Sequence, residues 1–244
     1  MKRFLIALQF LTIFPIRLKS DVNGKDLGAS LIYFPVVGAL IGMILAAISA
    51  IFGFLPYTVM IALVLISSIA LTGAIHLDGF ADTCDGFFGS RSKEKILEIM
   101  RDSRIGTMGA AGIACLLLLK FTVLVSIPHD ILWKALVMMA AFSRMCQCLA
   151  CYMSGYAREE GKAEGFIKYA GIKEALGAAV ITLALFTLLM GLKGIIIFFI
   201  ALPPVLLFIY YIKNKIGGMT GDTIGAASEL AEIVLLLFVL IHIG

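Results

Sequence analysis

Long apolar stretches alternate with short polar segments along almost the whole chain. A membrane-spanning helix needs about 20 mostly apolar residues, with a range of about 17–25. Seven stretches meet this length, at approximately residues 28–54, 57–75, 105–127, 135–153, 175–192, 194–212 and 224–243. The pattern predicts an all-α polytopic transmembrane helix bundle with about seven spanning helices, built as a single integral membrane domain over residues 1–244.

The first apolar stretch, Phe4 to Phe14, is too short to cross a bilayer. It follows a basic start and continues into further basic residues, without the small-residue site at which a signal peptide is cleaved. We therefore expect this segment to be retained as a short N-terminal interfacial or re-entrant helix.

The composition agrees with a membrane location. Apolar residues make up 61% of the chain and charged residues only 15%, and the mean hydropathy is +1.05. A soluble domain is usually about half apolar and a quarter charged, so we expect most of this surface to face the lipid bilayer. The net charge of +4 is modest and gives no indication of a nucleic-acid partner.

Lysine and arginine are distributed unevenly between the two sides of the predicted bundle. Of the 20 such residues, 16 lie in one set of connections, namely 1–27, 76–104, 154–174 and 213–223. The opposite set contains only Lys134 and Lys193. Because basic loops stay in the cytoplasm, we expect a multi-pass protein of the cytoplasmic membrane. Its N-terminus and long polar loops would face the cytoplasm and its C-terminus the outside.

An acidic segment follows the second spanning stretch. If the helix continues, Asp78, Asp82 and Asp85 stand at i, i+4 and i+7 and line one face. Residues 76–90 contain no Lys or Arg to neutralise them. Carboxylates this close repel one another unless a cation lies among them, and hard oxygen ligands favour Mg²⁺, Mn²⁺ or Ca²⁺ over zinc. The alternative is a solvated acidic helix end that only marks the membrane surface.

Basic and acidic residues also occur where the chain re-enters the membrane, at Arg101, Asp102 and Arg104. Arginine at this place suits phosphate oxygens, because its planar guanidinium can donate two parallel hydrogen bonds.

A glycine-rich segment, residues 217–225, leads into the last apolar stretch and contains Asp222 and Thr223. Backbone N–H groups at such a helix start can bind phosphate, and the aspartate can bind a metal. The alternative is that Asp222 or Thr223 caps the helix.

Two further polar residues have open roles. Arg144 lies within a spanning stretch, where an ionisable side chain usually faces a pocket or an ion-pair partner. His76, at the start of the acidic segment, could contact phosphate or hydrogen-bond to the backbone.

Together these residues indicate an enzyme that acts on a diphosphate with the help of a metal ion. A transporter is the rival class, but transporters usually place carboxylates near the bilayer midplane between repeated halves, and no repeat is visible in this sequence.

Three polar motifs occur in the chain, namely Ala74-Ile-His76-Leu-Asp78-Gly-Phe-Ala-Asp82-Thr-Cys-Asp85-Gly86, Ile99-Met-Arg101-Asp102-Ser103-Arg104-Ile-Gly106 and Gly218-Met-Thr-Gly221-Asp222. These motifs resemble the adenosylcobinamide-GDP ribazoletransferase, or cobalamin synthase, family. Two N-terminal segments are similar to the same family, Phe10-Leu-Thr-Ile-Phe-Pro15 and Phe34-Pro35-Val-Val-Gly38-Ala. The resemblance covers nearly the whole chain.

The resemblance implies a membrane transferase that completes the cobamide coenzyme. Its substrates would be adenosylcobinamide-GDP and α-ribazole or its 5′-phosphate, and its products adenosylcobalamin or its phosphate and GMP, with Mg²⁺. It also leaves a homo-oligomer open. Mapped onto this chain, the metal ligands are Asp78, Asp82 and Asp85, the candidate bases Asp102 and Asp222, and the substrate-binding residues His76, Arg101, Arg104, Arg144 and Thr223.

A second family, the CDP-alcohol phosphotransferases, is similar only in part. Asp82-x-x-Asp85-Gly86 matches the start of that family's signature, but the second half is missing at the expected place. A lipid-headgroup transferase is therefore the alternative interpretation.

Overall fold

A computed structural model describes residues 1–18 and 21–243, and nearly all of the regular structure in these residues is helical. Lys19, which belongs to the basic N-terminal connection, lies outside the described residues. The helices are α1 (Lys2–Leu11), α2 (Gly24–Ser30), the 3₁₀ turn η1 (Leu31–Tyr33), α3 (Phe34–Ile51), α4 (Tyr57–Thr72), α5 (Ile75–Gly89), α6 (Lys93–Ile99), α7 (Thr107–Ser126), α8 (His129–Met153), α9 (Glu164–Lys168), α10 (Ile172–Met190), α11 (Leu192–Ile216) and α12 (Gly221–Ile243).

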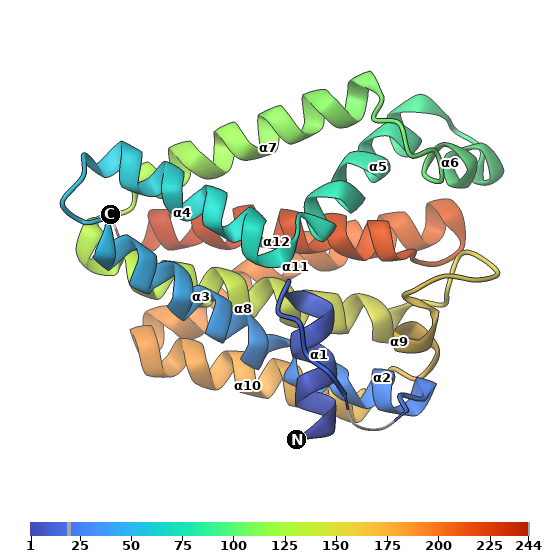
Figure 1. Cartoon of the computed structure of the whole chain (residues 1–244), viewed down its shortest axis with the longest axis horizontal. Helices are drawn as coiled ribbons and strands as arrows, with labels where there is room; N and C mark the ends of the chain where they lie inside the picture. Colours follow the sequence, from blue (N-terminus) through green and yellow to red (C-terminus); the bar gives the residue numbers. More distant parts are fainter. Residues whose placement is uncertain (19–20, 244) are drawn as a thin grey trace.

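The long helices run side by side along the longest axis of the molecule (Figure 1). Six helical segments in the described residues are long and apolar enough to cross a membrane, and the bent pair α4 and α5 would make a seventh. Each predicted stretch corresponds to one of these segments. The prediction of an all-α polytopic bundle is therefore confirmed.

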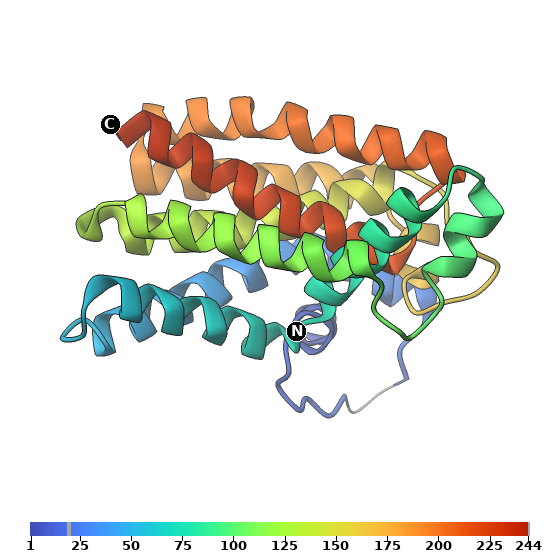
Figure 2. The same ribbon diagram turned by 90° about the horizontal axis from the view of Figure 1, so that it is seen from above.

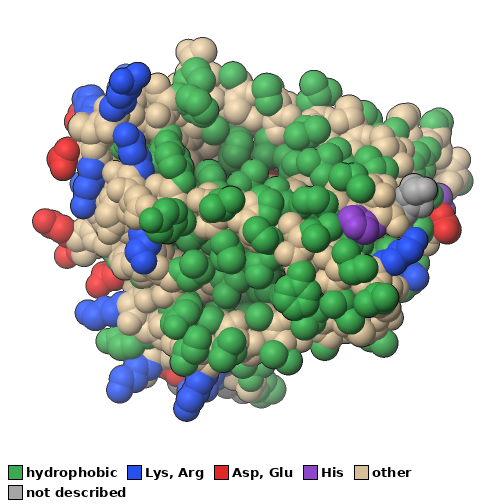
Figure 3. Space-filling model, turned by 180° about the vertical axis from the view of Figure 1, so that it is seen from behind, with side chains coloured by type: hydrophobic (Ala, Val, Ile, Leu, Met, Phe, Trp, Pro, Cys, Tyr) green, Lys and Arg blue, Asp and Glu red, His purple; other side chains and the backbone are tan. Residues whose placement is uncertain are grey.

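Charged side chains gather at one end of the bundle, and hydrophobic side chains cover its middle (Figure 3). The charged end holds α6 and α9 and their loops, whereas the C-terminus lies at the opposite end (Figure 1). This distribution follows the uneven placement of Lys and Arg in the sequence.

Helix α1 lies across the direction of the long helices (Figures 1 and 2). It has ten residues, with Ile6, Ala7 and Leu11 buried against the bundle. A helix this short cannot span, so its inward face packs on the protein instead.

Helix α8 forms the centre of the bundle. Between Leu132 and Cys151 nearly all of its side chains are buried, because α3, α10 and α12 surround it. Its contact with α3 is close: a Cβ atom added at Gly38 would lie 2.2 Å from the backbone oxygen of Ala140. The outer helices α7, α10 and α11 leave many apolar side chains exposed, as expected for surfaces that face lipid.

The expectation that the helix of residues 57–75 continues unbroken into the acidic segment is wrong. Helix α4 ends at Thr72, and the next helix, α5, turns away by 89°. Gly73 and Ala74 between them adopt the left-handed conformation, with φ of 60° and 58°. Glycine accepts this conformation readily and commonly ends a helix, whereas for alanine it is strained. The acidic residues therefore belong to a separate helix at the charged end.

Candidate functional site

The three aspartates of the acidic segment share helix α5. Asp78, Asp82 and Asp85 follow one another at helical spacing, so they form a row along the helix. Asp78 is exposed, while Asp82 and Asp85 are half-buried. We call these three residues the acidic row. Helices α12 and α7 pack against α5 and supply its neighbours.

The start of α12 touches α5 almost backbone to backbone. A Cβ atom at Gly79 would lie 2.7 Å from both Cα and the backbone oxygen of Asp222, and one at Gly225 would lie 3.1 Å from Cα of His76. Glycine is required for this approach. It brings Asp222, which is far away in the sequence, beside the acidic row.

Replacing Gly79 by alanine should destabilise the protein, although alanine usually favours a helix by about 1 kcal/mol. The added methyl group meets backbone rather than a flexible side chain, so we expect a cost of about 1–3 kcal/mol from overpacking. Thermal unfolding in detergent tests this. Gly221→Ala is the matched control, because its Cβ would lie 3.5 Å from that of Ala163, an ordinary contact. Equal melting temperatures for the two variants would contradict the close contact.

Asp222 stands in the first turn of α12, but it does not cap the helix. The cap is Thr220, whose Oγ1 accepts from the backbone N of Thr223 at 3.2 Å. In return, the backbone N of Thr220 donates to Oγ1 of Thr223 at 2.8 Å. Thr223 is fully buried and its hydroxyl is used in this exchange, so the structure does not favour the substrate-binding role of Thr223, which stays a prediction. Its contribution is to fix the turn that carries Asp222.

Asp85 joins α5 to α7. Its Oδ2 accepts from the backbone N of Gly106 at 2.7 Å, and its Oδ1 accepts from that of Gly109 at 2.8 Å. These N–H groups have no partner within α7, because they belong to its first turn. The carboxylate therefore caps α7 and is also drawn to the positive end of that helix.

Negative charge accumulates around Asp82. This residue lies within electrostatic reach of the carboxylates of Asp222, Asp78 and Asp85, and of one cation, Arg158. In the described part of the chain, no three Asp, Glu, His or Cys side chains converge closely enough to hold a metal ion. The donor chemistry nevertheless fits a hard divalent cation, because several carboxylates face a single guanidinium. The metal ligands assigned from the sequence stay a prediction.

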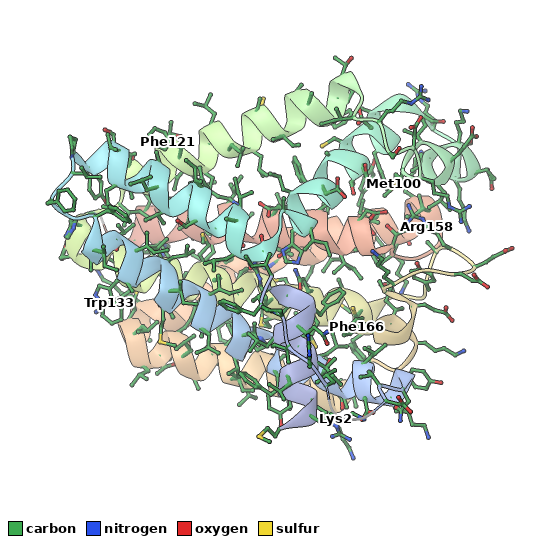
Figure 4. The ribbon with its side chains drawn as sticks, viewed as in Figure 1. Lys2, Met100, Phe121, Trp133, Arg158 and Phe166 are labelled. Atoms are coloured by element: carbon green, nitrogen blue, oxygen red, sulfur yellow. The ribbon has the colours of Figure 1, made fainter. Side chains whose placement is uncertain are left out.

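Arg158 is a site residue that the sequence did not single out. Residues 155–157 pair with 217–219 through two backbone hydrogen bonds, Ala157 N to Met219 O at 3.0 Å and Met219 N to Gly155 O at 2.9 Å. This pairing places Nη2 of Arg158 2.8 Å from Oδ2 of Asp222. Figure 4 shows Arg158 at the charged end, near Met100.

Arg101, Asp102 and Arg104 lie in the exposed segment between α6 and α7. Arg104 donates to both oxygens of Asp102, from Nε at 3.0 Å and from Nη2 at 2.7 Å. These bonds lower the pKa of Asp102 to about 2. Such a weak base is poorly suited to take a proton at neutral pH, so the structure does not favour the catalytic role of Asp102, which stays a prediction.

Two cavities flank the acidic row. An open cleft of about 910 Å³ lies at the Asp85 end and is lined by Arg101, Arg104 and Lys95 among others. A more enclosed cavity of about 190 Å³ lies at the other end, lined by Asp78 and Asp222. The row thus runs from one cavity to the other, with Asp82 between them.

Arg144 takes part in a buried ion network rather than in either cavity. Its Nη1 contacts Oε1 of Glu232, whose Oε2 lies 2.8 Å from Nζ of Lys120. The same Nζ lies 2.6 Å from Oε2 of Glu229. Arg144 is 1% exposed. Arg144 thus has the ion-pair partner considered from the sequence, while its substrate-binding role stays a prediction. We call these four residues the buried ion network.

His76 is also buried, but it lines the enclosed cavity. Its Nε2 lies 2.8 Å from Nε2 of Gln147 on α8. It therefore makes a side-chain contact instead of the backbone hydrogen bond considered from the sequence.

Fold and site together define a multi-span membrane protein with clustered carboxylates and arginines at the charged end of its bundle. The family model described as cobalamin-5-phosphate synthase matches residues 3–240, and the chain belongs to this family.

Curated relatives agree with this family. The adenosylcobinamide-GDP ribazoletransferase of Acetivibrio thermocellus is 40% identical over 234 residues, which cover 95% of this chain and 94% of the relative. The protein of the same name from Clostridium acetobutylicum is 38% identical over 238 residues, covering 95% of this chain and 92% of the relative. The one from Fusobacterium nucleatum is 36% identical and covers 99% and 98%. No solved structure matches the chain.

Proposed function

We propose that this chain, a transferase of cobalamin synthesis, joins α-ribazole or its 5′-phosphate to adenosylcobinamide-GDP. The products are adenosylcobalamin or its phosphate and GMP. The observation that carries the proposal is the match to ribazoletransferases over 95% or more of the chain. The acidic row between two cavities supports it, since two large substrates must meet at one diphosphate.

The reaction exchanges a phosphoanhydride bond for a phosphoester bond. A ribose hydroxyl oxygen of the ribazole attacks the phosphorus nearest cobinamide, and the bond from this phosphorus to the bridging oxygen breaks. GMP leaves with the electron pair, and the hydroxyl proton passes to a base. Asp222 is the better candidate for this base, because it lines the enclosed cavity next to Asp78 and α5. Arg158 would hold its carboxylate in place.

The metal assignment belongs to this proposal. Asp78, Asp82 and Asp85 would hold Mg²⁺, and the carboxylate of Asp222 adds to the negative charge around Asp82. Mg²⁺ when bound neutralises negative charge on a diphosphate and on its leaving group. Four carboxylates, counting that of Asp82 itself, lie near one guanidinium, that of Arg158, and this excess of negative charge supports the assignment.

Arg101 and Arg104 would bind the nucleotide side of the diphosphate. Both line the open cleft, and Arg104 is already oriented by Asp102. A cleft of about 910 Å³ suits the larger substrate, which carries both a nucleotide and a corrin ring. Guanidinium groups match phosphate oxygens in geometry and charge.

The site would face the cytoplasm. Lys and Arg side chains gather at the charged end of the bundle (Figure 3), and α5, which carries the acidic row, lies toward the same end (Figure 1). Basic loops are retained on the cytoplasmic side of a membrane. The N-terminus would therefore be inside and the C-terminus outside, with the bilayer around the apolar middle.

The test is product formation by the purified protein in lipid nanodiscs with Mg²⁺. Adenosylcobinamide-GDP and α-ribazole should yield GMP and a corrinoid whose mass is that of the joined product. Turnover of CDP-linked lipid precursors instead would favour the CDP-alcohol phosphotransferase alternative. Movement of solute across vesicles without bond cleavage would favour a transporter. Either result, with no GMP formed, would overturn the proposal.

A further inference from the structure

The enclosed cavity is lined by residues from the two N-terminal segments that begin at Phe10 and at Phe34, which have no role in the proposed reaction. Phe10 of α1 and Phe34 at the start of α3 line it together with Phe166 of α9. The ring centroids of Phe10 and Phe166 are 4.4 Å apart, and those of Phe34 and Phe166 are 5.7 Å apart. In Figure 4, Phe166 lies near α1. Three segments distant in the sequence thus build one aromatic wall.

A buried polar pair lines the same cavity. His76 is 5% exposed and Gln147 is 1% exposed. They contact each other through His76 Nε2 and Gln147 Nε2 at 2.8 Å. Nδ1 of His76 and Oε1 of Gln147 are left without a hydrogen-bond partner in the described part of the chain. Buried polar groups normally have partners, so unsatisfied atoms beside a cavity point to a ligand that supplies them.

Two carboxylates also line the cavity. Asp78 belongs to the acidic row, and Asp222 lies beside that row. A ligand that filled the aromatic part would therefore extend a polar portion toward the site of phosphoryl chemistry. The cavity volume of about 190 Å³ admits a two-ring heterocycle but not a corrin.

We propose that this cavity binds the aromatic base of the ribazole nucleoside, with the Phe10–Phe34–Phe166 wall against its ring face and the His76–Gln147 pair as its hydrogen-bond partner. The proposal rests on the proposed function and assigns one of its two substrates. The base is a flat, largely apolar two-ring azole with one free ring nitrogen, which is a hydrogen-bond acceptor. Histidine and glutamine can each donate to it, according to tautomer and amide orientation. The ribose would then extend toward Asp222.

This assignment changes the role of His76. From the sequence it could have contacted phosphate, but an aromatic cavity is a poor environment for a phosphate group. The assignment also separates the substrates: the nucleoside enters at the Asp78 end and adenosylcobinamide-GDP at the Asp85 end.

The first test needs no variant. The α-riboside of an indole has nearly the same shape as that of a benzimidazole but lacks the free ring nitrogen. With the unaltered protein in nanodiscs, we expect KM for the indole riboside to be about tenfold or more above that for α-ribazole, because the buried pair stays unsatisfied. Equal KM values would overturn the assignment of the polar pair.

The second test uses Gln147→Leu, which keeps the size of the side chain. We expect KM for α-ribazole to rise about tenfold, with KM for adenosylcobinamide-GDP unchanged within about twofold. Gln147→Leu should not raise KM for the indole riboside, because this compound has no free ring nitrogen to accept a hydrogen bond. A rise in KM for adenosylcobinamide-GDP, or an equal loss with both ribosides, would overturn the proposal. Absence of GMP from the unaltered protein would instead contradict the proposed function.

Discussion

Asp82→Asn should lower the rate of GMP release by about 10³-fold or more while the protein still inserts and folds. The substitution keeps the shape of the side chain and removes the negative charge at the middle of the acidic row. Asp82 lies within reach of three other carboxylates and is the member of the row between the two cavities. Loss of one charge that acts on a diphosphate in the transition state costs rate rather than stability.

The control for this experiment is Asp130→Asn. Asp130 is an exposed aspartate in the first turn of α8, far from the acidic row in the bundle. The same chemical change there should leave GMP release unaltered. Circular dichroism and thermal unfolding should be alike for both variants and the unaltered protein. Normal turnover by Asp82→Asn would exclude this residue from the site.

Lys120→Met should reduce the free energy of unfolding by about 3–5 kcal/mol, because it leaves a buried carboxylate without its cation. Glu229 bonds to Lys120 at 2.6 Å and is buried. Glu232 is less affected, since it also contacts Arg144. Unfolding in mixed detergent, followed by circular dichroism, measures the loss.

The double variant Lys120→Met/Glu229→Gln distinguishes charge from packing. It removes one cation and one anion of the buried ion network and leaves Arg144 paired with Glu232. We expect at least half of the lost stability to return, because no buried charge is then unpaired. A double variant that is no more stable than Lys120→Met would show that Glu229 does not depend on this lysine.

Local periodicity explains what could be predicted from the sequence. The spanning regions follow from runs of apolar residues, and the acidic row follows from a spacing of four and three residues within one helix. Neither depends on which helices are neighbours. The break at Gly73 and Ala74 could not be predicted from local periodicity, because an alanine gives no local signal for a left-handed conformation.

Contacts between distant segments could not be predicted in this way. Asp85 caps α7, and Arg158 binds Asp222, through pairings that only the packing of helices creates. Arg144 shows the same limit: an arginine within a spanning stretch signals a partner, but the sequence does not say whether that partner is a substrate or Glu232. Gly79 and Gly225 allow α5 and α12 to pack closely, and this role is visible only once the two helices are known to be neighbours.

The most direct measurement is GMP release at increasing Mg²⁺ concentration after removal of bound metal with a chelator. If the acidic row holds the metal, the unaltered protein should be inactive in the chelator and recover fully with Mg²⁺. Asp82→Asn should stay inactive throughout the titration. Full GMP release in the presence of the chelator would contradict a metal-dependent reaction at Asp78, Asp82 and Asp85.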